Sequence, residues 1–240
     1  MSPDGKTLYV LLQSAAIQEG GLDNGSRRYT RFLVYDVPLI GTPTVKAEYV
    51  VPLPIYLNAN GKKRVAAQSE IYYISDTQFL VLARDSNSGH GQSDSLSRYR
   101  HVDVFDISNA TNVNTATYNA INGSIASSNG TLKTGVTAAT YCSWLDYNVN
   151  AQLNRFGVHN GGAQDAGLLN EKWESLALAP INGNGGDGKF YLFSFSDNDF
   201  ITQNGYLKDG QFKYADESGF NLDNQMLVFE VTLPKGTRAI

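Results

Sequence analysis

Hydrophobic and polar positions alternate in short runs along this chain, and one two-strand pattern occurs three times. The first strand of the pattern covers residues 8–14, 79–85 and 191–197, which line up position for position. The second strand reads Val, Tyr or Phe, Asp or Glu, and Val or Ile, at residues 34–37, 104–107 and 228–231. Because one small sheet cannot bury both of its faces alone, this repeat predicts a radial all-β array.

Further strands extend each copy into a predicted propeller blade of about four strands. The second copy predicts strands at residues 68–74, 78–85 and 100–108, with a fourth around 113–121. The third copy predicts strands at 171–180, 189–197 and 224–233, with a glycine-rich hairpin loop at 183–188. Leu145, Val149, Leu153 and Phe156 follow a helical spacing, which predicts a short helical insertion near 137–156. The predicted fold class is all-β: a partial β-propeller with about three blades visible.

The first copy begins at a turn. Residues 2–6 read Ser-Pro-Asp-Gly-Lys, a β-turn signal that leads directly into the second strand of its blade. We therefore expect residues 1–240 to be a single propeller domain that lacks its N-terminal blades, with an open inner sheet edge. The alternative is that the carboxyl end of the chain covers this edge.

Composition and charge argue against several classes of partner. The net charge is −4, and the longest basic run is Lys62-Lys63-Arg64, which argues against nucleic-acid binding. No apolar stretch approaches the roughly 20 residues of a membrane span. Cys142 is the single cysteine, so it has no partner for a disulfide within the chain, and we expect it to be buried.

Four sequons for N-glycosylation lie at Asn24, Asn109, Asn122 and Asn129. About three would arise by chance in a chain this rich in Asn, Ser and Thr. Three of them fall between residues 109 and 131, a polar stretch that we predict to be an exposed loop where glycans can attach.

The third copy resembles a known family. Residues 173–178 read Trp-Glu-Ser-Leu-Ala-Leu, residues 188–192 read Gly-Lys-Phe-Tyr-Leu, and residues 196–199 read Ser-Asp-Asn-Asp. This is similar to the E-G-L-A and D-G-x-L-Y pattern of the phytase-like group (esterase-like activity of phytase), with Ser175 where Gly is usual. The second copy matches less well, and the first matches only over residues 2–9. The resemblance implies a β-propeller of a secreted fungal or bacterial protein, an esterase or phosphatase activity, and a chain shorter than most members.

Five acidic residues are predicted to meet at one mouth of the propeller. Glu70 and Glu174 are matched by the repeat, as are Asp85 and Asp197, and Asp199 follows two residues later. Clustered carboxylates repel one another unless a cation lies among them, and oxygen ligands suit calcium or magnesium. We therefore expect a divalent cation, calcium in the first place, with the ligands Asp85, Asp197, Asp199 and Glu174. The alternative is that these acids cap strand ends and bond turn amides.

Basic residues and histidines complete the predicted site. The candidate catalytic groups, as general acid or base, are Glu174, Glu70 and His90. The candidate substrate-binding groups, among which the two cations would hold phosphate oxygens, are Arg84, Lys172 and His159. Alternatively, the two cations only neutralise nearby carboxylates, and the two histidines are ordinary loop residues.

The sequence thus predicts an extracellular hydrolase of small-molecule phosphate or carboxylic esters, in which the cation lowers the pKa of a water nucleophile. One alternative is a non-catalytic propeller that binds a protein or glycan and holds structural calcium. Another is a lactonase-like or strictosidine-synthase-like propeller with a central metal. Trp173 and the tyrosines could form sugar-stacking surfaces, although aromatic residues on strands more often belong to the core.

Overall fold

The three repeats each form a small antiparallel sheet in the computed structural model, which describes residues 1–234 and 237. The first sheet contains, in order, β1 (Thr7–Leu11), β2 (Tyr29–Asp36) and β3 (Thr44–Pro52). The second contains β6 (Ala67–Tyr73), β7 (Gln78–Arg84), β8 (Arg100–Asp106) and β9 (Thr140–Asp146). The third contains β10 (Lys172–Pro180), β11 (Lys189–Asp197) and β14 (Met226–Thr232). The predicted all-β class is confirmed.

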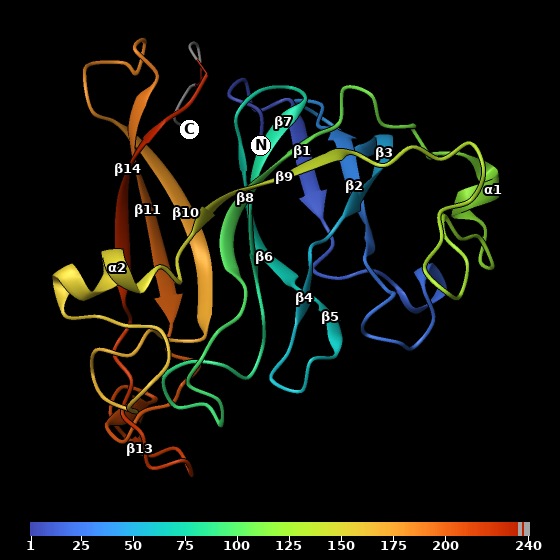
Figure 1. Cartoon of the computed structure of the whole chain (residues 1–240). Helices are drawn as coiled ribbons and strands as arrows, with labels where there is room; N and C mark the ends of the chain where they lie inside the picture. Colours follow the sequence, from blue (N-terminus) through green and yellow to red (C-terminus); the bar gives the residue numbers. More distant parts are fainter. Residues whose placement is uncertain (235–236, 238–240) are drawn as a thin grey trace.

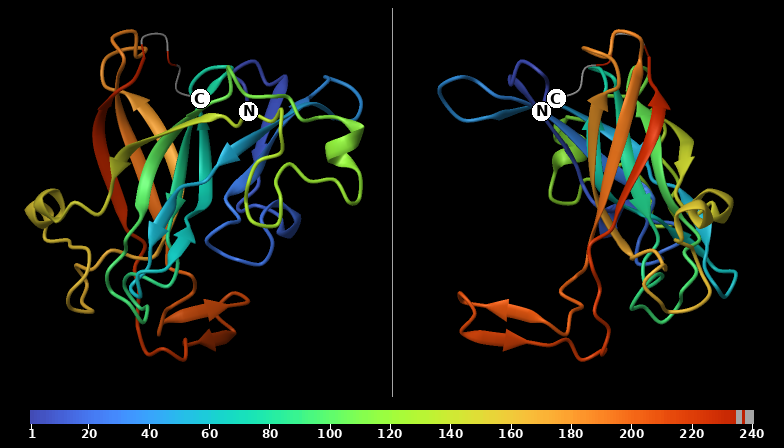
Figure 2. Two further views of the ribbon diagram at one scale, coloured as in Figure 1. Left: turned by 45° about the vertical axis from the view of Figure 1, so that its right-hand side comes forward. Right: turned by 90° about the vertical axis from the view of Figure 1, so that its left-hand side faces the viewer.

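Smaller elements lie in the connections. Two separate hairpins pair β4 (Ile55–Leu57) with β5 (Lys63–Val65), and β12 (Gly205–Leu207) with β13 (Phe212–Tyr214). The second hairpin projects away from the sheets (Figure 2). The helical segments are η1 (Ile17–Glu19), α1 (Ala116–Asn119), α2 (Asn150–Leu153) and η2 (Asn154–Phe156). No helix among the described residues has the length and apolar character needed to cross a membrane.

The predicted helical insertion near 137–156 is wrong over its first half. Residues 140–146 form β9, the fourth strand of the second sheet, whereas residues 113–121, where that strand was predicted, contain α1. The apolar stripe is divided between elements: Leu145 lies on β9, Leu153 is buried on α2, and Phe156 is 77% exposed. The helical spacing of the four apolar residues is a coincidence: a turn separates β9 from α2, so the four residues do not lie on one helix.

The three sheets stack face to face in chain order (Figure 1). The interface between the first and second sheets is formed mainly by Leu11, Phe32, Val34, Phe79, Val81 and Phe105. The interface between the second and third sheets is formed mainly by Leu80, Leu82, Val102, Trp173, Leu178 and Leu192. Each of these side chains is at most 7% exposed, so the two interfaces constitute most of the apolar core.

Cross-strand pairing shows that the third repeat is shifted by one residue from the predicted alignment. Tyr9 pairs with Val34 and Leu80 pairs with Val104, but Val228 pairs with Phe193. Phe193 is therefore equivalent to Leu80, a place that the sequence alignment assigned to Leu192. A slip of one residue moves a side chain to the other face of its sheet, so Phe193, rather than Leu192, lies on the face that corresponds to the Leu80 face of the second sheet.

The same shift separates Glu70 from Glu174. Each innermost strand, β6 and β10, contains an irregularity in register: the extra residue is Ser69 in β6 and Glu174 in β10. Glu174 is therefore equivalent to Ser69, and Glu70 is equivalent to Ser175. The prediction that the two glutamates hold matching places is wrong. Both strands carry the bulge at the same place, so the mismatch comes from the one-residue shift of the third repeat.

With the corrected register, the outer face of the third sheet matches faces that are buried in the other two. Phe195, Met226 and Val228 are 46%, 51% and 44% exposed. Their equivalents in the first sheet, Leu11, Phe32 and Val34, are at most 7% exposed. The third sheet thus presents to solvent the kind of face that the first and second sheets present to their neighbours.

Two edge strands, β1 and β9, bear on predictions made from the sequence. β1 lies at one edge of its sheet. It pairs with β2 on one side, and no strand of the described residues pairs with it on the other side. The alternative that the carboxyl end covers this edge concerns, in part, residues outside the described range. β9 lies at an edge of the second sheet and carries Cys142 exposed, so the prediction of a buried cysteine is wrong.

Candidate functional site

A polar pocket lies at the lower end of the interface between the first and second sheets. Its cavity volume is about 430 Å³, and it is bordered by the β4–β5 hairpin and by the loops before β2 and after β7. The side chains that define its chemistry are Arg27, Tyr56, Arg64, Asp85, Asp94 and Arg98. We call this cavity the arginine pocket.

Short-range hydrogen bonds fix the loops around the arginine pocket. The Asn58 side chain accepts hydrogen bonds from the backbone N–H groups of Asn60 and Lys62, which closes the β4–β5 hairpin. Asp85, only 3% exposed, accepts from the Ser97 hydroxyl and from the backbone N–H of Arg98, both at 2.7 Å. The loop from 86 to 97 is therefore tied to the end of β7, as expected for a short acidic side chain at a turn.

Two of the three arginines keep their charge available. Arg98 forms an ion pair with Asp94 at 2.6 Å. Arg27 and Arg64 have no acidic partner within ion-pair distance among the described residues, and their side chains bond only Asn24 and the Lys63 carbonyl. An unpaired guanidinium presents several N–H donors in a planar fork, which suits a carboxylate or phosphate.

Tyr56 adds an aromatic wall to the arginine pocket. Burial raises the pKa of the Tyr56 phenol, and the nearby Asp85 carboxylate raises it further. The phenol therefore stays protonated at neutral pH. It provides a neutral donor beside the arginines.

The predicted cation Arg84 is committed to acidic neighbours. Its guanidinium donates to Glu174 at 3.0 Å, to Glu171 at 3.4 Å and to the Ser69 hydroxyl at 3.1 Å. Arg84 is only 6% exposed and faces the interface between the second and third sheets. The structure thus brings Arg84 and Glu174 together, as one of the alternatives anticipated, and neither of them lines the arginine pocket.

Lys172 lies among the acids at the end of the third sheet. It donates to Asp199 at 2.8 Å, and this bond raises the pKa of the Lys172 ammonium. The charges of Glu174 and Asp197 also favour the charged ammonium. A lysine therefore supplies positive charge where the sequence predicted a divalent cation.

The predicted calcium ligands do not form a shared oxygen cage. Asp85 belongs to the arginine pocket, whereas Asp197 and Asp199 lie beside Lys172, and Glu174 bonds Arg84. Within the described part of the chain, no three His, Cys, Asp or Glu side chains come together as a metal-binding group. The donor set does not fit a common ion, and calcium stays a prediction.

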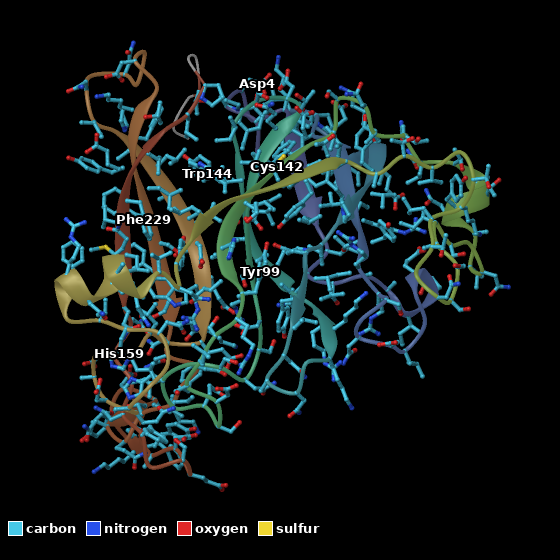
Figure 3. The ribbon with its side chains drawn as sticks, viewed as in Figure 1. Asp4, Tyr99, Cys142, Trp144, His159 and Phe229 are labelled. Carbon is cyan, nitrogen blue, oxygen red and sulfur yellow. The ribbon has the colours of Figure 1, made fainter. Side chains whose placement is uncertain are left out.

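The remaining predicted residues are dispersed. Glu70 is half-buried on β6, where burial raises the pKa of its carboxyl. His90 packs edge-to-face against Phe220, and burial lowers the pKa of its imidazole. His159, at the lower end of the molecule (Figure 3), bonds Asp165 at 2.9 Å and the Gly161 carbonyl at 2.7 Å.

Most of the chain matches a known protein family. The description "Phytase-like: Esterase-like activity of phytase" matches residues 1–200. The chain belongs to the phytase-like family. An uncharacterized secreted protein of Arthroderma benhamiae is 44% identical over 216 residues, which cover 85% of this chain and 42% of that protein. The chain therefore spans less than half the length of this phytase-like relative. No solved structure matches the chain.

The three arginines of the arginine pocket were not predicted from the sequence as site residues. Arg27, Arg64 and Arg98 lie more than 30 residues apart in successive steps and follow no motif. Only the stacking of two sheets brings their loops together. Turn residues around 23–27, 58–61 and 94–98 mark these segments as loops, but not as neighbours.

Proposed function

We propose that this phytase-like chain forms part of an ester hydrolase that binds the anionic group of its substrate in the arginine pocket. The observation that carries this proposal is the pair of arginines, Arg27 and Arg64, that line a 430 Å³ cavity without acidic partners. The three guanidinium groups of the pocket outnumber its two carboxylates, Asp85 and Asp94, so a bound anion would compensate the excess positive charge. The family description, which names an esterase-like activity, supports the same class of substrate.

Within this proposal, Arg27 and Arg64 hold a phosphate or carboxylate group, and the Tyr56 hydroxyl donates to one of its oxygens. Asp94 positions the attacking water. Hydrogen bonds from the Leu96 N–H and from Arg98 lower the pKa of the Asp94 carboxyl, so it is ionised and can accept a proton from that water. Water adds to the phosphorus or carbonyl carbon, the ester bond breaks, and the alcohol leaves with the proton that Asp94 accepted from the water.

The test compares ester turnover in matched variants. The wild-type protein is expected to hydrolyse p-nitrophenyl phosphate or p-nitrophenyl acetate, and Arg64→Gln to raise the KM for the phosphate roughly ten- to hundredfold, since a hydrogen bond to a charged group contributes about 1.5–3 kcal/mol. Arg155→Gln, an exposed arginine on η2, is the control. Wild-type protein without turnover of either ester, or an unchanged KM in Arg64→Gln, contradicts the proposal.

The calcium prediction is tested separately. If Asp85, Asp197, Asp199 and Glu174 bind calcium, the melting temperature rises with calcium and falls with EDTA. The ion pairs of Glu174 with Arg84 and of Asp199 with Lys172 argue against this response. Glu70 and His90 stay candidates for proton transfer, and Arg84, Lys172 and His159 for substrate binding, only if the reaction takes place beside these ion pairs.

We also propose that the three sheets are consecutive blades of a β-propeller. Support comes from the two interfaces, in which equivalent residues face the same direction around the stack, and from the exposed apolar face of the third sheet. A further sheet would cover Phe195, Met226 and Val228 as the second sheet covers Leu11, Phe32 and Val34. An experimental structure of a longer member in which this face meets solvent would contradict the proposal.

An extracellular, N-glycosylated protein is proposed on similar grounds. The relative from Arthroderma benhamiae is named as secreted, and all four sequon asparagines are exposed. Mass spectrometry of peptides from the secreted protein, before and after removal of N-glycans, tests this proposal at Asn24, Asn109, Asn122 and Asn129. Unmodified asparagine at all four positions contradicts it.

A further inference from the structure

A second pocket lies at the upper end of the same interface between the first and second sheets. Its cavity volume is about 580 Å³. The turn before β1, the start of β3 and the turn between β6 and β7 border it. Its chemistry is defined by Tyr9, Tyr49, Tyr73, Asp4, Asp76 and Lys46, and we call it the tyrosine pocket. No part of the proposed ester hydrolysis uses it.

The aromatic rings of the tyrosine pocket are fixed by the core beneath them. Tyr9 stacks on Phe32 with a centroid distance of 5.9 Å, and lies edge-on to Phe79 at 4.8 Å. Tyr73 lies 5.7 Å from Tyr9 and also contacts Phe79. All three tyrosines remain partly exposed, so their rings form a wall that is rigid on one side and open on the other.

Two carboxylates at the mouth are held in defined positions. Asp4 (Figure 3) accepts hydrogen bonds from the Ser2 hydroxyl at 2.7 Å and the Lys6 N–H at 3.1 Å, and these bonds lower the pKa of its carboxyl. Asp76 accepts from the Tyr73 hydroxyl at 2.8 Å. Both side chains are otherwise exposed and retain oxygens that can accept further hydrogen bonds.

The Tyr49 hydroxyl is the free group of the pocket. It forms no hydrogen bond with any residue that the structure describes, whereas its ring packs against the apolar cluster between the two sheets. A ligand can therefore receive a hydrogen bond from Tyr49 without displacing an internal partner.

We infer that the tyrosine pocket binds a neutral saccharide. The apolar C–H face of a pyranose ring matches tyrosine rings, and its hydroxyl groups are donors that carboxylates accept well. Phosphate and other anions are disfavoured, because the described residues that line the pocket include two carboxylates and Lys46 as their single cation. A purely apolar ligand would leave Asp4, Asp76 and Tyr49 without new partners. A fixed aromatic wall with a few convergent polar groups is the usual form of a small-molecule site.

The experiment titrates the whole chain with cellohexaose, maltohexaose and chitohexaose by calorimetry. We expect saturable binding of at least one of these neutral oligosaccharides, with an affinity that inorganic phosphate does not change. Tyr49→Ala should weaken binding about tenfold or more, and Asp76→Asn severalfold. The matched control is Tyr206→Ala on the β12–β13 hairpin, where the ring is 62% exposed.

Two outcomes would overturn the inference. One is the absence of binding of all three sugars at millimolar concentration. The other is unchanged affinity in both Tyr49→Ala and Asp76→Asn. If Tyr49→Ala fails to fold, Asp76→Asn decides, because Asp76 is exposed and outside the core. Ester hydrolysis is measured independently, since it is assigned to the other end of the interface.

Discussion

The two ends of one sheet interface carry opposite chemistry. The arginine pocket, at the end where β1, β3 and β7 finish, has three guanidinium groups and two carboxylates. The tyrosine pocket, at the end where β1 and β3 begin, has three phenols, two carboxylates and one ammonium group. The same two sheets carry both pockets. The chemistry differs because loops and the β4–β5 hairpin supply the charges of one, whereas β1, β3 and β6 supply the rings of the other. A single stacked core can therefore support two ligand sites whose chemistry varies independently.

The pockets also differ in how their polar groups are held. In the arginine pocket, Arg27 and Arg98 lie on loops and Arg64 lies on the β4–β5 hairpin, and Asp85 bonds the loop before β8 through Ser97 and Arg98. In the tyrosine pocket, the rings extend from strands or strand ends and pack on core phenylalanines. Hydrogen bonds from turn side chains therefore hold the arginine pocket, whereas ring packing on the core holds the tyrosine pocket.

The largest expected effect concerns the core between the two pockets. Phe79→Ala removes a ring that contacts Tyr9, Phe32 and Phe105, so the free energy of unfolding should fall by about 3–5 kcal/mol. Chemical denaturation measures this loss. Phe156→Ala, with a 77% exposed ring, should change stability little. A decrease of less than about 1 kcal/mol in the free energy of unfolding would show that the core around Phe79 does not support the two pockets.

The next effect separates the pockets by ligand. The double variant Arg27→Gln/Arg64→Gln should weaken binding of a phosphate ester about a hundredfold and leave oligosaccharide affinity unchanged. Asp76→Asn should do the reverse, with a smaller loss. Calorimetry of both ligands on the same three proteins gives the comparison. Parallel losses of both ligands in either variant would mean that the pockets are coupled.

Ionic strength should have a smaller effect, and it should change ligand affinity at the arginine pocket only. Raising the ionic strength from about 0.05 to 0.5 M shortens the Debye length several-fold, which weakens anion binding by the partly exposed arginines. Binding of a neutral sugar involves no net charge and should stay constant. A salt-sensitive sugar affinity would indicate that charge, rather than ring contact, dominates the tyrosine pocket.

The smallest effect is the pH response of loops near the lower end. Asp165 and the Gly161 carbonyl raise the pKa of His159, whereas burial lowers the pKa of His90. The His159 contribution to stability is therefore complete below its unfolded pKa of about 6.5 and is lost as pH rises through the folded value. NMR titration of the two rings should show His159 losing its proton at higher pH than His90. In Asp165→Asn the His159 pKa should return toward its ordinary value; no change would remove Asp165 as the cause.

Most strands of the fold could be predicted from the sequence. Strands predicted at 68–74, 78–85, 100–108, 171–180, 189–197 and 224–233 correspond to β6, β7, β8, β10, β11 and β14 within two residues at either end. They were predictable because alternation and turn residues are local signals. β9 was missed, because its apolar residues also match a helical period and its strand neighbour is distant in sequence.

The candidate site was less predictable, because it depends on register and on contacts between sheets. The third repeat is shifted by one residue from the predicted alignment, so Glu70 and Glu174 are not equivalent, although both strands carry a bulge at the same place. Arg27, Arg64 and Arg98 meet only when two sheets stack. The local sequence indicated which residues have useful chemistry, and the tertiary structure determined which of them share a cavity.

The exposed thiol on β9 has a practical consequence. Cys142 is the single cysteine of the chain and is exposed, so a maleimide reagent would attach one fluorophore or spin label at one position. β9 pairs with β8. Arg98, two residues before β8, lines the arginine pocket, and Ile107, directly after β8, lines the tyrosine pocket. The natural sequence therefore accepts a spectroscopic reporter on the strand pair that connects the two cavities, and no substitution is needed.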